Sequence, residues 1–334
     1  MSRIAILGGG GWGTALAILL SRARESHQVA IWVHDGALAG AMREKRENTT
    51  YLPGQAIPPE ILVLADLREA VVRAEIVVGA MPAAHAREIY AAALAHVQAD
   101  AVIVSATKGL EPATHARMSE VIARTVRRRA AGKIAVLSGP SFAQEAARGE
   151  PTAVVLACED DAIAQSLQAC FAGPTLRLYT NRDVLGVELA GAMKNVIAIA
   201  AGVCQGLGLG ANTLAALITR GLAEMTRLAA ALGAQPGTLG GLAGLGDLVL
   251  TCTGALSRNR HVGIELGKGR TLAEILGGMK MVAEGVGTAA ALLALAREHN
   301  VEMPITKQVN AILYQGTGPA AAIREIMERP QKSE

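Results

Sequence analysis

Seven short runs of mainly apolar residues recur between residues 3 and 180, and helical patterns separate them. Val, Ile, Leu and Ala dominate these runs, which read RIAILGG, QVAIWVH, EIVVGAM, AVIVSAT, KIAVLSG, TAVVLAC and LRLYT. Continuous apolar strands joined by helices are typical of a parallel sheet that helices cover on both faces. The first part of the chain is therefore predicted to be a doubly wound α/β domain.

The strand pattern stops after about residue 186, and helical periodicity follows. Gly-rich turns punctuate this part, whose helical segments include ELAGAMKNVIAIAAGV, NTLAALITRGLAEMTRLAAALG and AEGVGTAAALLALAREHN. A chain of 334 residues is long enough for two domains with substantial cores. We expect an α/β domain over residues 1–185 and an all-helical domain over residues 186–334.

The charge balance argues against a polyanionic partner. The formal net charge is +3, and the lysines and arginines are scattered along the chain. Their one cluster, Arg127, Arg128 and Arg129, stands at the end of a helical pattern, where it complements the helix dipole rather than binding a polyanion. We expect no nucleic-acid partner.

The cysteines and the hydropathy pattern exclude two further classes of protein. The four cysteines lack metal-ligand spacing, which predicts no metal site and reduced, buried thiols in a cytoplasmic protein; they are Cys158, Cys170, Cys204 and Cys252. Glycine-containing turns interrupt both uncharged stretches, residues 4–20 and 195–219. We therefore expect no membrane insertion, no signal peptide in the first stretch, and two helices joined by a turn in the second.

The first apolar run leads into GGGGWG and then into a helical pattern. Gly8, Gly10 and Gly13 fit the G-x-G-x-x-G motif, in which the glycines permit a tight turn, close approach of a pyrophosphate and close packing of helix and strand. The phosphates would then lie at a helix N-terminus. The motif alone is weak, but this strand-turn-helix context predicts a dinucleotide-binding, Rossmann-like domain.

The end of the second run, VHD, leaves the choice of cofactor open. If His34 lies at the ribose, a 2′-phosphate is tolerated, whereas Asp35 at that position favours a free 2′-hydroxyl. Asp35 could equally begin a turn and contact no cofactor. We expect NADP or NAD, with NADP favoured.

Polar residues follow two of the apolar runs, where the carboxyl edge of the sheet is expected to bind ligands. Lys108 in SATKGLE could supply positive charge to a phosphate or a carbonyl group, or could be a solvated loop lysine. The Gly-Pro turn in SGPSFA, residues 138–143, offers Ser141 and backbone N–H groups.

Two features of the second part could carry chemistry. Lys194 lies in the apolar segment LAGAMKNVIAIAAG, where an ammonium group is costly unless it is paired, reaches solvent or serves catalysis. Farther along, Asp247 follows a Gly-rich turn, and the triplet Ser257, Arg258 and Asn259 could bind a phosphate, although an ordinary turn has the same composition.

These segments together resemble the bacterial NAD(P)-dependent glycerol-3-phosphate dehydrogenase family. The resemblance runs from residue 3 to about residue 330 and is carried by RIAILGGGGWGTALA, ATKGLE, SGPSFA, GVELAGAMKNVIAIAAG, LITRGLAEM, GLAGLGDLVLTCTGALSRNR, VAEG and EMPIT. It implies reversible reduction of dihydroxyacetone phosphate by NAD(P)H to sn-glycerol 3-phosphate, which supplies phospholipid synthesis. A possible homodimer is also implied.

The resemblance also implies roles for individual residues. It makes Lys194 the catalytic acid/base, which would stabilise and protonate the developing oxyanion. It puts around the substrate Lys108, Gly139, Ser141, Lys194, Asp247, Ser257, Arg258 and Asn259. Besides the motif glycines, it puts around the cofactor Gly11, Trp12, His34, Lys108, Ala143, Arg258, Val282 and Glu284. Our own hypothesis adds that Asp247 orients Lys194 by a charge-assisted hydrogen bond.

The chain departs from the family pattern at two places, and two alternatives stay open. Gly11 stands where relatives often carry a small polar side chain, and the loop LGLGAN lacks an aromatic residue. One alternative is a reductase of the same build that acts on a β-hydroxyacid or on ketopantoate and needs no phosphate site at Arg258. The other is a nucleotide-sensing module without turnover, which has little use for Lys194.

Overall fold

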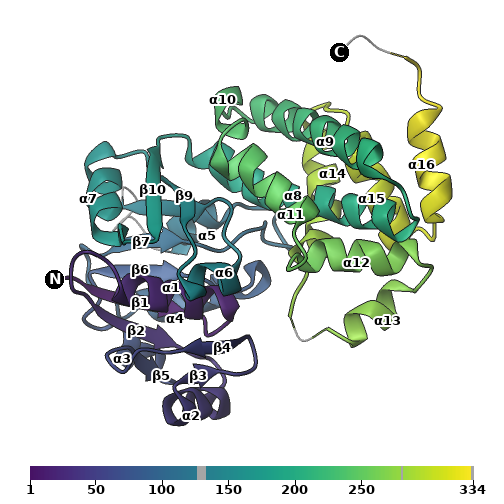
Figure 1. Ribbon diagram of the computed structural model, residues 1–334. Helices are drawn as coiled ribbons and strands as arrows, with labels where there is room; N and C mark the ends of the chain where they lie inside the picture. Colours follow the sequence, from purple (N-terminus) through teal and green to yellow (C-terminus); the bar gives the residue numbers. More distant parts are fainter. Residues whose placement is uncertain (126–132, 280, 332–334) are drawn as a thin grey trace. The chain divides into compact units, whose positions relative to one another are not determined.

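The computed structural model describes residues 1–125, 133–279 and 281–331. The chain forms two compact units, each of which is considered by itself (Figure 1). The first comprises Met1–Glu111 and Ala116–Glu188, and the second comprises Pro112–His115 and Leu189–Glu334. The arginine triplet at 127–129 lies outside the described residues.

Within the described part of the first unit, eight strands form one sheet. In spatial order they are β10 (Leu176–Asn181), β9 (Thr152–Ala157), β8 (Ile134–Ser138), β7 (Val102–Ser105), β6 (Ile76–Gly79), β1 (Arg3–Leu7), β2 (Gln28–Trp32) and β5 (Leu62–Leu64). Each of the seven predicted runs corresponds to one of these strands. The three-residue strand β5 was not predicted, because so short a segment carries no readable pattern.

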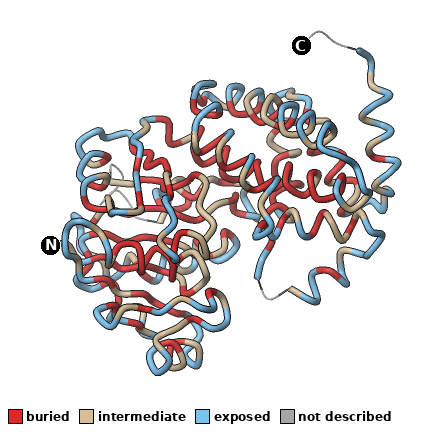
Figure 2. Tube along the Cα trace, viewed as in Figure 1, coloured by how far each residue is buried: buried red, intermediate tan, exposed pale blue. Residues whose placement is uncertain are grey.

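Helices cover both faces of this sheet, as predicted. They are α1 (Gly11–Ser21), α2 (Gly36–Lys45), α3 (Leu67–Val71), the 3₁₀ turn η1 (Ala83–His85), α4 (Ala86–Leu94), α5 (Met118–Thr125), α6 (Ala143–Arg148) and α7 (Asp161–Phe171). Ile4 and Ile6 of β1 pack in a core with α1 and α7, whereas Ala5 and Leu7 pack in a second core with α4 and α5. Alternate side chains of one strand therefore enter two buried layers. Much of the sheet is drawn in red, the colour of buried residues, in Figure 2.

One pair of strands departs from the predicted parallel arrangement. β8 and β9 pair antiparallel, with Leu137 opposite Leu156, and β10 then pairs parallel to β9. The connection between β8 and β9, residues 139–151, contains the six-residue helix α6 and returns the chain to the edge where β8 ends. β9 therefore starts at that edge and runs antiparallel to β8.

The regular elements described in the second unit are all helices, as predicted. They are α8 (Val184–Gly206, which begins in the first unit), α9 (Ala211–Ala231), α10 (Pro236–Leu239), the π-helical turn η2 (Leu242–Gly246), α11 (Asp247–Thr253), α12 (Arg258–Gly267), α13 (Leu272–Gly277), α14 (Glu284–Glu298), α15 (Pro304–Tyr314) and α16 (Pro319–Met327). The uncharged stretch 195–219 is divided between α8 and α9, as expected. Helix α8 is long and apolar enough to cross a membrane. However, 89% of its apolar 18-residue stretch is buried inside the protein, as is common for core helices.

Glycines let α8 and α12 approach backbone to backbone. A Cβ atom on Gly202 of α8 would overlap the carbonyl oxygen of Arg260, and one on Gly263 of α12 would overlap that of Ile199. Such close approach is possible only without side chains. The crossing therefore fixes the start of α12 relative to the helix that carries Lys194.

Candidate functional site

The Gly-rich turn of the first unit has the geometry that the motif predicted. Gly8 has φ +129°, and a Cβ atom there would lie 2.7 Å from the carbonyl oxygen of Ala80. A Cβ on Gly13 would overlap the carbonyl oxygen of Gly8, whereas Gly10 faces open space. Gly10 precedes α1, and no side chain caps this helix end. The first N–H groups of α1 are therefore suited to a phosphate.

The two residues that could contact the ribose, His34 and Asp35, make different contacts in the structure. The Asp35 carboxylate caps α2 by accepting hydrogen bonds from the backbone N–H groups of Ala37 (2.8 Å) and Leu38 (3.2 Å). Asp35 thus caps a helix, whereas the structural alternative left open above was the start of a turn. His34 is exposed, and its ring packs edge-on against Trp32 with 5.6 Å between ring centroids.

Lys108 and the Gly-Pro turn meet at the end of neighbouring strands, as expected. The Lys108 ammonium donates to the carbonyl oxygen of Gly139 at 2.9 Å and lies 3.5 Å from the Ser141 hydroxyl. Ala143 is the first residue of α6, and its Cβ lies 3.7 Å from the position that a Cβ on Gly11 would take. The starts of α1 and α6 are therefore adjacent within this unit.

In the second unit, Lys194 is a buried and paired ammonium group. Its Nζ donates to Asp247 Oδ1 and to Thr251 Oγ1, both at 2.7 Å. The side chains of Lys194 and Asp247 are only 7% and 1% exposed, so the charges compensate each other in surroundings of low polarity. The hypothesis of a direct contact between these two residues is confirmed.

The predicted phosphate triplet forms the start of α12. Ser257 caps this helix by accepting from the N–H group of Arg260. Arg258 is exposed as a whole, but neighbouring protein atoms desolvate its guanidinium and lower its pKa, and the Glu284 carboxylate opposes this shift. Arginine remains charged nevertheless, so Arg258 can present a cation beside the free N–H groups of a helix start.

Asn259 is buried and engaged with its neighbours rather than facing solvent. Its Nδ2 donates to Asn195 Oδ1, and its Oδ1 accepts from the backbone N–H of Gly285, both at 2.9 Å. These hydrogen bonds join α8, α12 and α14. The three bonded residues, Asn195, Asn259 and Gly285, each directly follow a predicted site residue, namely Lys194, Arg258 and Glu284. Val282, two residues before α14, is 51% exposed.

Three polar residues at these positions were not singled out from the sequence. Thr251 lies one helical turn after Asp247, and this spacing is the one available signal for it. Asn195 adjoins Lys194, but nothing in the sequence shows that it meets Asn259. Asn48 lies in a hairpin that the strand patterns did not reveal.

The residues present fit a dinucleotide, and the described residues show no metal centre. The uncapped start of α1 and the open space at Gly10 suit phosphates, and the Trp12 Nε1–H is buried without a hydrogen-bond partner in the described structure. No group of three or more His, Cys, Asp or Glu side chains within residues 1–125, 133–279 and 281–331 could hold a metal ion. The four cysteines are free and buried, and burial raises the pKa of Cys252 to about 12, so this thiol beside Thr251 is neutral.

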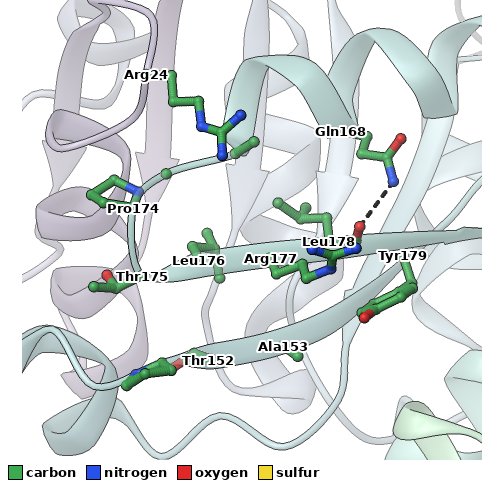
Figure 3. A pocket seen from close by; sticks show the side chains of 13 residues that line it. Arg24, Thr152, Ala153, Gln168, Pro174, Thr175, Leu176, Arg177, Leu178 and Tyr179 are labelled. Atoms are coloured by element: carbon green, nitrogen blue, oxygen red, sulfur yellow. Dashed lines mark hydrogen bonds between the residues drawn. The ribbon is translucent and has the colours of Figure 1, made fainter.

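A groove of about 560 Å³ lies elsewhere, along the edge strand β10 (Figure 3). Its lining includes Arg24, Arg177 and Tyr179, and Gln168 of α7 donates to the carbonyl oxygen of Leu178 at 2.8 Å. None of the predicted site residues lines it. We assign this groove no role in catalysis.

Comparison with known proteins agrees with this arrangement. Residues 3–164 match the family described as NAD-dependent glycerol-3-phosphate dehydrogenase N-terminus, and residues 183–324 match the corresponding C-terminus. A glycerol-3-phosphate dehydrogenase [NAD(P)+] of Koribacter versatilis is 54% identical over 100% of this chain and 99% of its own length. One from Acidobacterium capsulatum is 53% identical, with 100% of both chains covered.

A solved structure has the same fold over nearly the whole length. The glycerol-3-phosphate dehydrogenase of Coxiella burnetii is 39% identical and superposes with a TM-score of 0.92, covering 98% of this chain and 99% of its own. Both halves of the sequence and the full-length fold thus point the same way. The chain belongs to the NAD-dependent glycerol-3-phosphate dehydrogenase family.

Proposed function

We propose that the protein catalyses the reversible NAD(P)H-dependent reduction of dihydroxyacetone phosphate to sn-glycerol 3-phosphate and so supplies glycerophospholipid synthesis. The first unit would bind the dinucleotide and the second the substrate, in line with the predicted domains 1–185 and 186–334. The observation that carries the proposal is the buried ammonium of Lys194, which Asp247 and Thr251 hold at 2.7 Å.

Lys194 would act on the carbonyl oxygen of the ketone. A bound nicotinamide cofactor supplies the hydride, and negative charge then develops on that oxygen. An ammonium held by two fixed acceptors stabilises this charge and donates a proton to it. In the oxidative direction the neutral amine accepts the proton, and apolar surroundings favour the neutral form.

Arg258 would bind the substrate phosphate. Its guanidinium offers a planar set of donors, and the start of α12 adds backbone N–H groups and the positive end of a helix dipole. The Ser257 hydroxyl accepts from the Arg260 N–H and can still donate its own hydrogen. Asn259 would contribute through the second hydrogen of its Nδ2 group.

On the cofactor side, the glycine turn would hold the pyrophosphate, with Gly11, Trp12, Lys108 and Ala143 nearby. We propose a preference for NADP over NAD. Asp35 Oδ1 already accepts two backbone hydrogen bonds, whereas exposed His34 can approach a 2′-phosphate. The ratio of kcat/KM for NADPH to that for NADH measures this preference, and a ratio below one would contradict it.

The assignment of substrate and lysine is tested together by following oxidation of NADPH and NADH. Dihydroxyacetone phosphate, dihydroxyacetone and ketopantoate are compared for the wild type and Lys194→Ala. We expect turnover of the phosphorylated ketone and a loss of at least about 100-fold in kcat for the variant. Equal turnover of dihydroxyacetone would contradict the assignment of a phosphate site, and a fully active variant would contradict the assigned role of Lys194.

Two coarser features of the protein are also proposals. A cytoplasmic location is supported by the four free, buried cysteines, which suit a reducing compartment. The homodimer rests on the family resemblance alone, and light scattering during gel filtration tests it. A monomer at micromolar concentration would contradict it.

A further inference from the structure

We propose that Asn48 is a positioning residue for the cofactor: it holds the Gly-rich turn in the conformation that binds the pyrophosphate. This inference rests on the proposed function, because it takes the glycine turn as the dinucleotide site. Asn48 lies in the short hairpin of β3 (Glu47–Asn48) and β4 (Leu52–Ala56), which follows α2 and lies outside the main sheet.

Asn48 joins the hairpin to the glycine turn through its Nδ2 group, and its Oδ1 is held within the hairpin. Its Nδ2 donates to the carbonyl oxygen of Gly9 and to Thr14 Oγ1, both at 2.9 Å, while its Oδ1 accepts from the N–H of Tyr51 at 3.1 Å. Thr14 Oγ1 in turn donates to the carbonyl oxygen of Gly10 at 2.9 Å. The carbonyl groups of both Gly9 and Gly10 are thus restrained by one buried network.

The hairpin is itself firmly anchored, so it can act as a support. The Arg46 guanidinium donates to the carbonyl oxygens of Ile57, Pro58 and Ile61, and Glu47 Oε1 accepts from the N–H of Gly54. Leu52 is fully buried in the core that also contains residues of α1. The hairpin therefore keeps its position without the hydrogen bonds of Asn48.

The hairpin also explains why residue 11 is glycine in this chain. A Cβ atom on Gly11 would lie 2.8 Å from the carbonyl oxygen of Tyr51, which is closer than real Cβ atoms come to backbone oxygen. The hairpin backbone thus occupies the space of a side chain at the start of α1. Where the family resemblance led us to expect a small polar side chain, this chain has a close backbone contact instead.

These contacts predict an effect on cofactor binding in particular. Phosphate recognition by backbone N–H groups requires that the turn be held before the ligand arrives, since otherwise binding must order it. Without Asn48, the carbonyl group of Gly9 loses its side-chain hydrogen bond and can rotate together with the N–H group of Gly10, whereas the carbonyl group of Gly10 still accepts from the N–H and hydroxyl groups of Thr14. The residues of this network all belong to the first unit.

The test compares Asn48→Ala with a milder variant and a matched control. Thr14→Val keeps the volume of its side chain but removes the hydroxyl that Asn48 contacts. Gln168→Ala removes a hydrogen bond from a side-chain amide to the backbone carbonyl oxygen of Leu178, which lies in the edge strand at the other end of the same sheet. Calorimetry measures Kd for NADPH and for ADP-ribose, and steady-state kinetics give kcat and both KM values.

We expect Kd for both ligands to rise about 10-fold in Asn48→Ala and about 3-fold in Thr14→Val, consistent with the loss of one or two hydrogen bonds. KM for dihydroxyacetone phosphate and kcat at saturating cofactor should stay within about 2-fold of the wild type, and Gln168→Ala should bind normally. If Asn48→Ala does not fold, Thr14→Val decides. Reduced stability with unchanged Kd would overturn the inference, whereas a wild type that binds neither ligand would overturn the proposed function itself.

Discussion

The ammonium of Lys194 and the carboxylate of Asp247 lie 2.7 Å apart, although 53 positions separate the two residues in the sequence. Helix α8 supplies the cation, and the start of α11 supplies the anion. Removing one member of such a buried pair leaves an uncompensated group and costs about 3–5 kcal/mol. The pair thus makes it possible to keep a charged lysine inside an apolar helix.

Asp247→Asn should change the pH dependence of the reaction. Without the neighbouring negative charge the ammonium releases its proton at a lower pH, so activity in the reductive direction should decline at a lower pH than in the wild type. The measurement is kcat/KM for dihydroxyacetone phosphate against pH, with Asn212→Ala on the exposed start of α9 as a control. An unchanged pH profile would show that Asp247 does not orient Lys194.

Arg258→Ala should weaken the binding of phosphorylated substrate far more than that of the unphosphorylated ketone. Loss of a charge-assisted hydrogen bond of about 1.5–3 kcal/mol corresponds to a rise of about 10-fold to 150-fold in KM for dihydroxyacetone phosphate. Arg258→Lys keeps the charge but not the planar donors, so its effect should be intermediate. The weak turnover of dihydroxyacetone serves as the control, and an equal loss with both ketones would contradict the assignment.

Two glycines of α14 should respond in opposite ways to alanine. A Cβ on Gly285 would lie 2.6 Å from the carbonyl oxygen of Asn195 and 2.8 Å from Asn259 Oδ1, so Gly285→Ala should cost about 1–3 kcal/mol and raise KM for the substrate. Gly287, two residues on, faces open space, and Gly287→Ala should add about 0.5–1 kcal/mol without kinetic effect. Denaturant unfolding and substrate KM measure both. Equal behaviour of the two variants would argue against the Asn195–Asn259 network.

Glu224 should make stability depend on pH. It is fully buried in α9 and accepts hydrogen bonds from the N–H groups of Ile305 and Thr306 and from the Thr306 hydroxyl, yet burial outweighs these bonds and raises its pKa. Because the folded protein then holds the proton more tightly than the unfolded chain, this contribution is fully present below the ordinary glutamate pKa of about 4.3 and is lost as pH rises through the folded value.

The substitution Glu224→Gln removes this titration and one acceptor for the start of α15. Its destabilisation of about 1–3 kcal/mol should therefore be largest at low pH and shrink towards neutral pH. Burial also raises the pKa of Glu188, so part of the pH dependence remains in the variant. Tm measured against pH tests this, and a destabilisation that grows with pH would contradict the sign.

Local patterns in the sequence were sufficient for the fold class and for much of the candidate site. Apolar runs mark strands because a strand buried on both faces needs apolar side chains throughout, and seven such runs became strands. The glycine turn was readable because Gly8 must adopt φ +129° and Gly13 must admit a backbone carbonyl. Lys194 stood out because a charge in an apolar helix requires a reason.

The tertiary structure alone decided the direction of β9, the contact of Lys194 with Thr251 and the support that Asn48 gives to the glycine turn. The direction of β9 could not be read from the sequence, because residues 139–151 are long enough either to cross the sheet or to return to the same edge. The other contacts join residues 34 to 57 positions apart, such as Asn48 with Thr14 and Lys194 with Thr251. The periodicity of a sequence indicates which face of a helix or strand is buried. Which side chains then contact each other between two elements depends on how the whole elements pack.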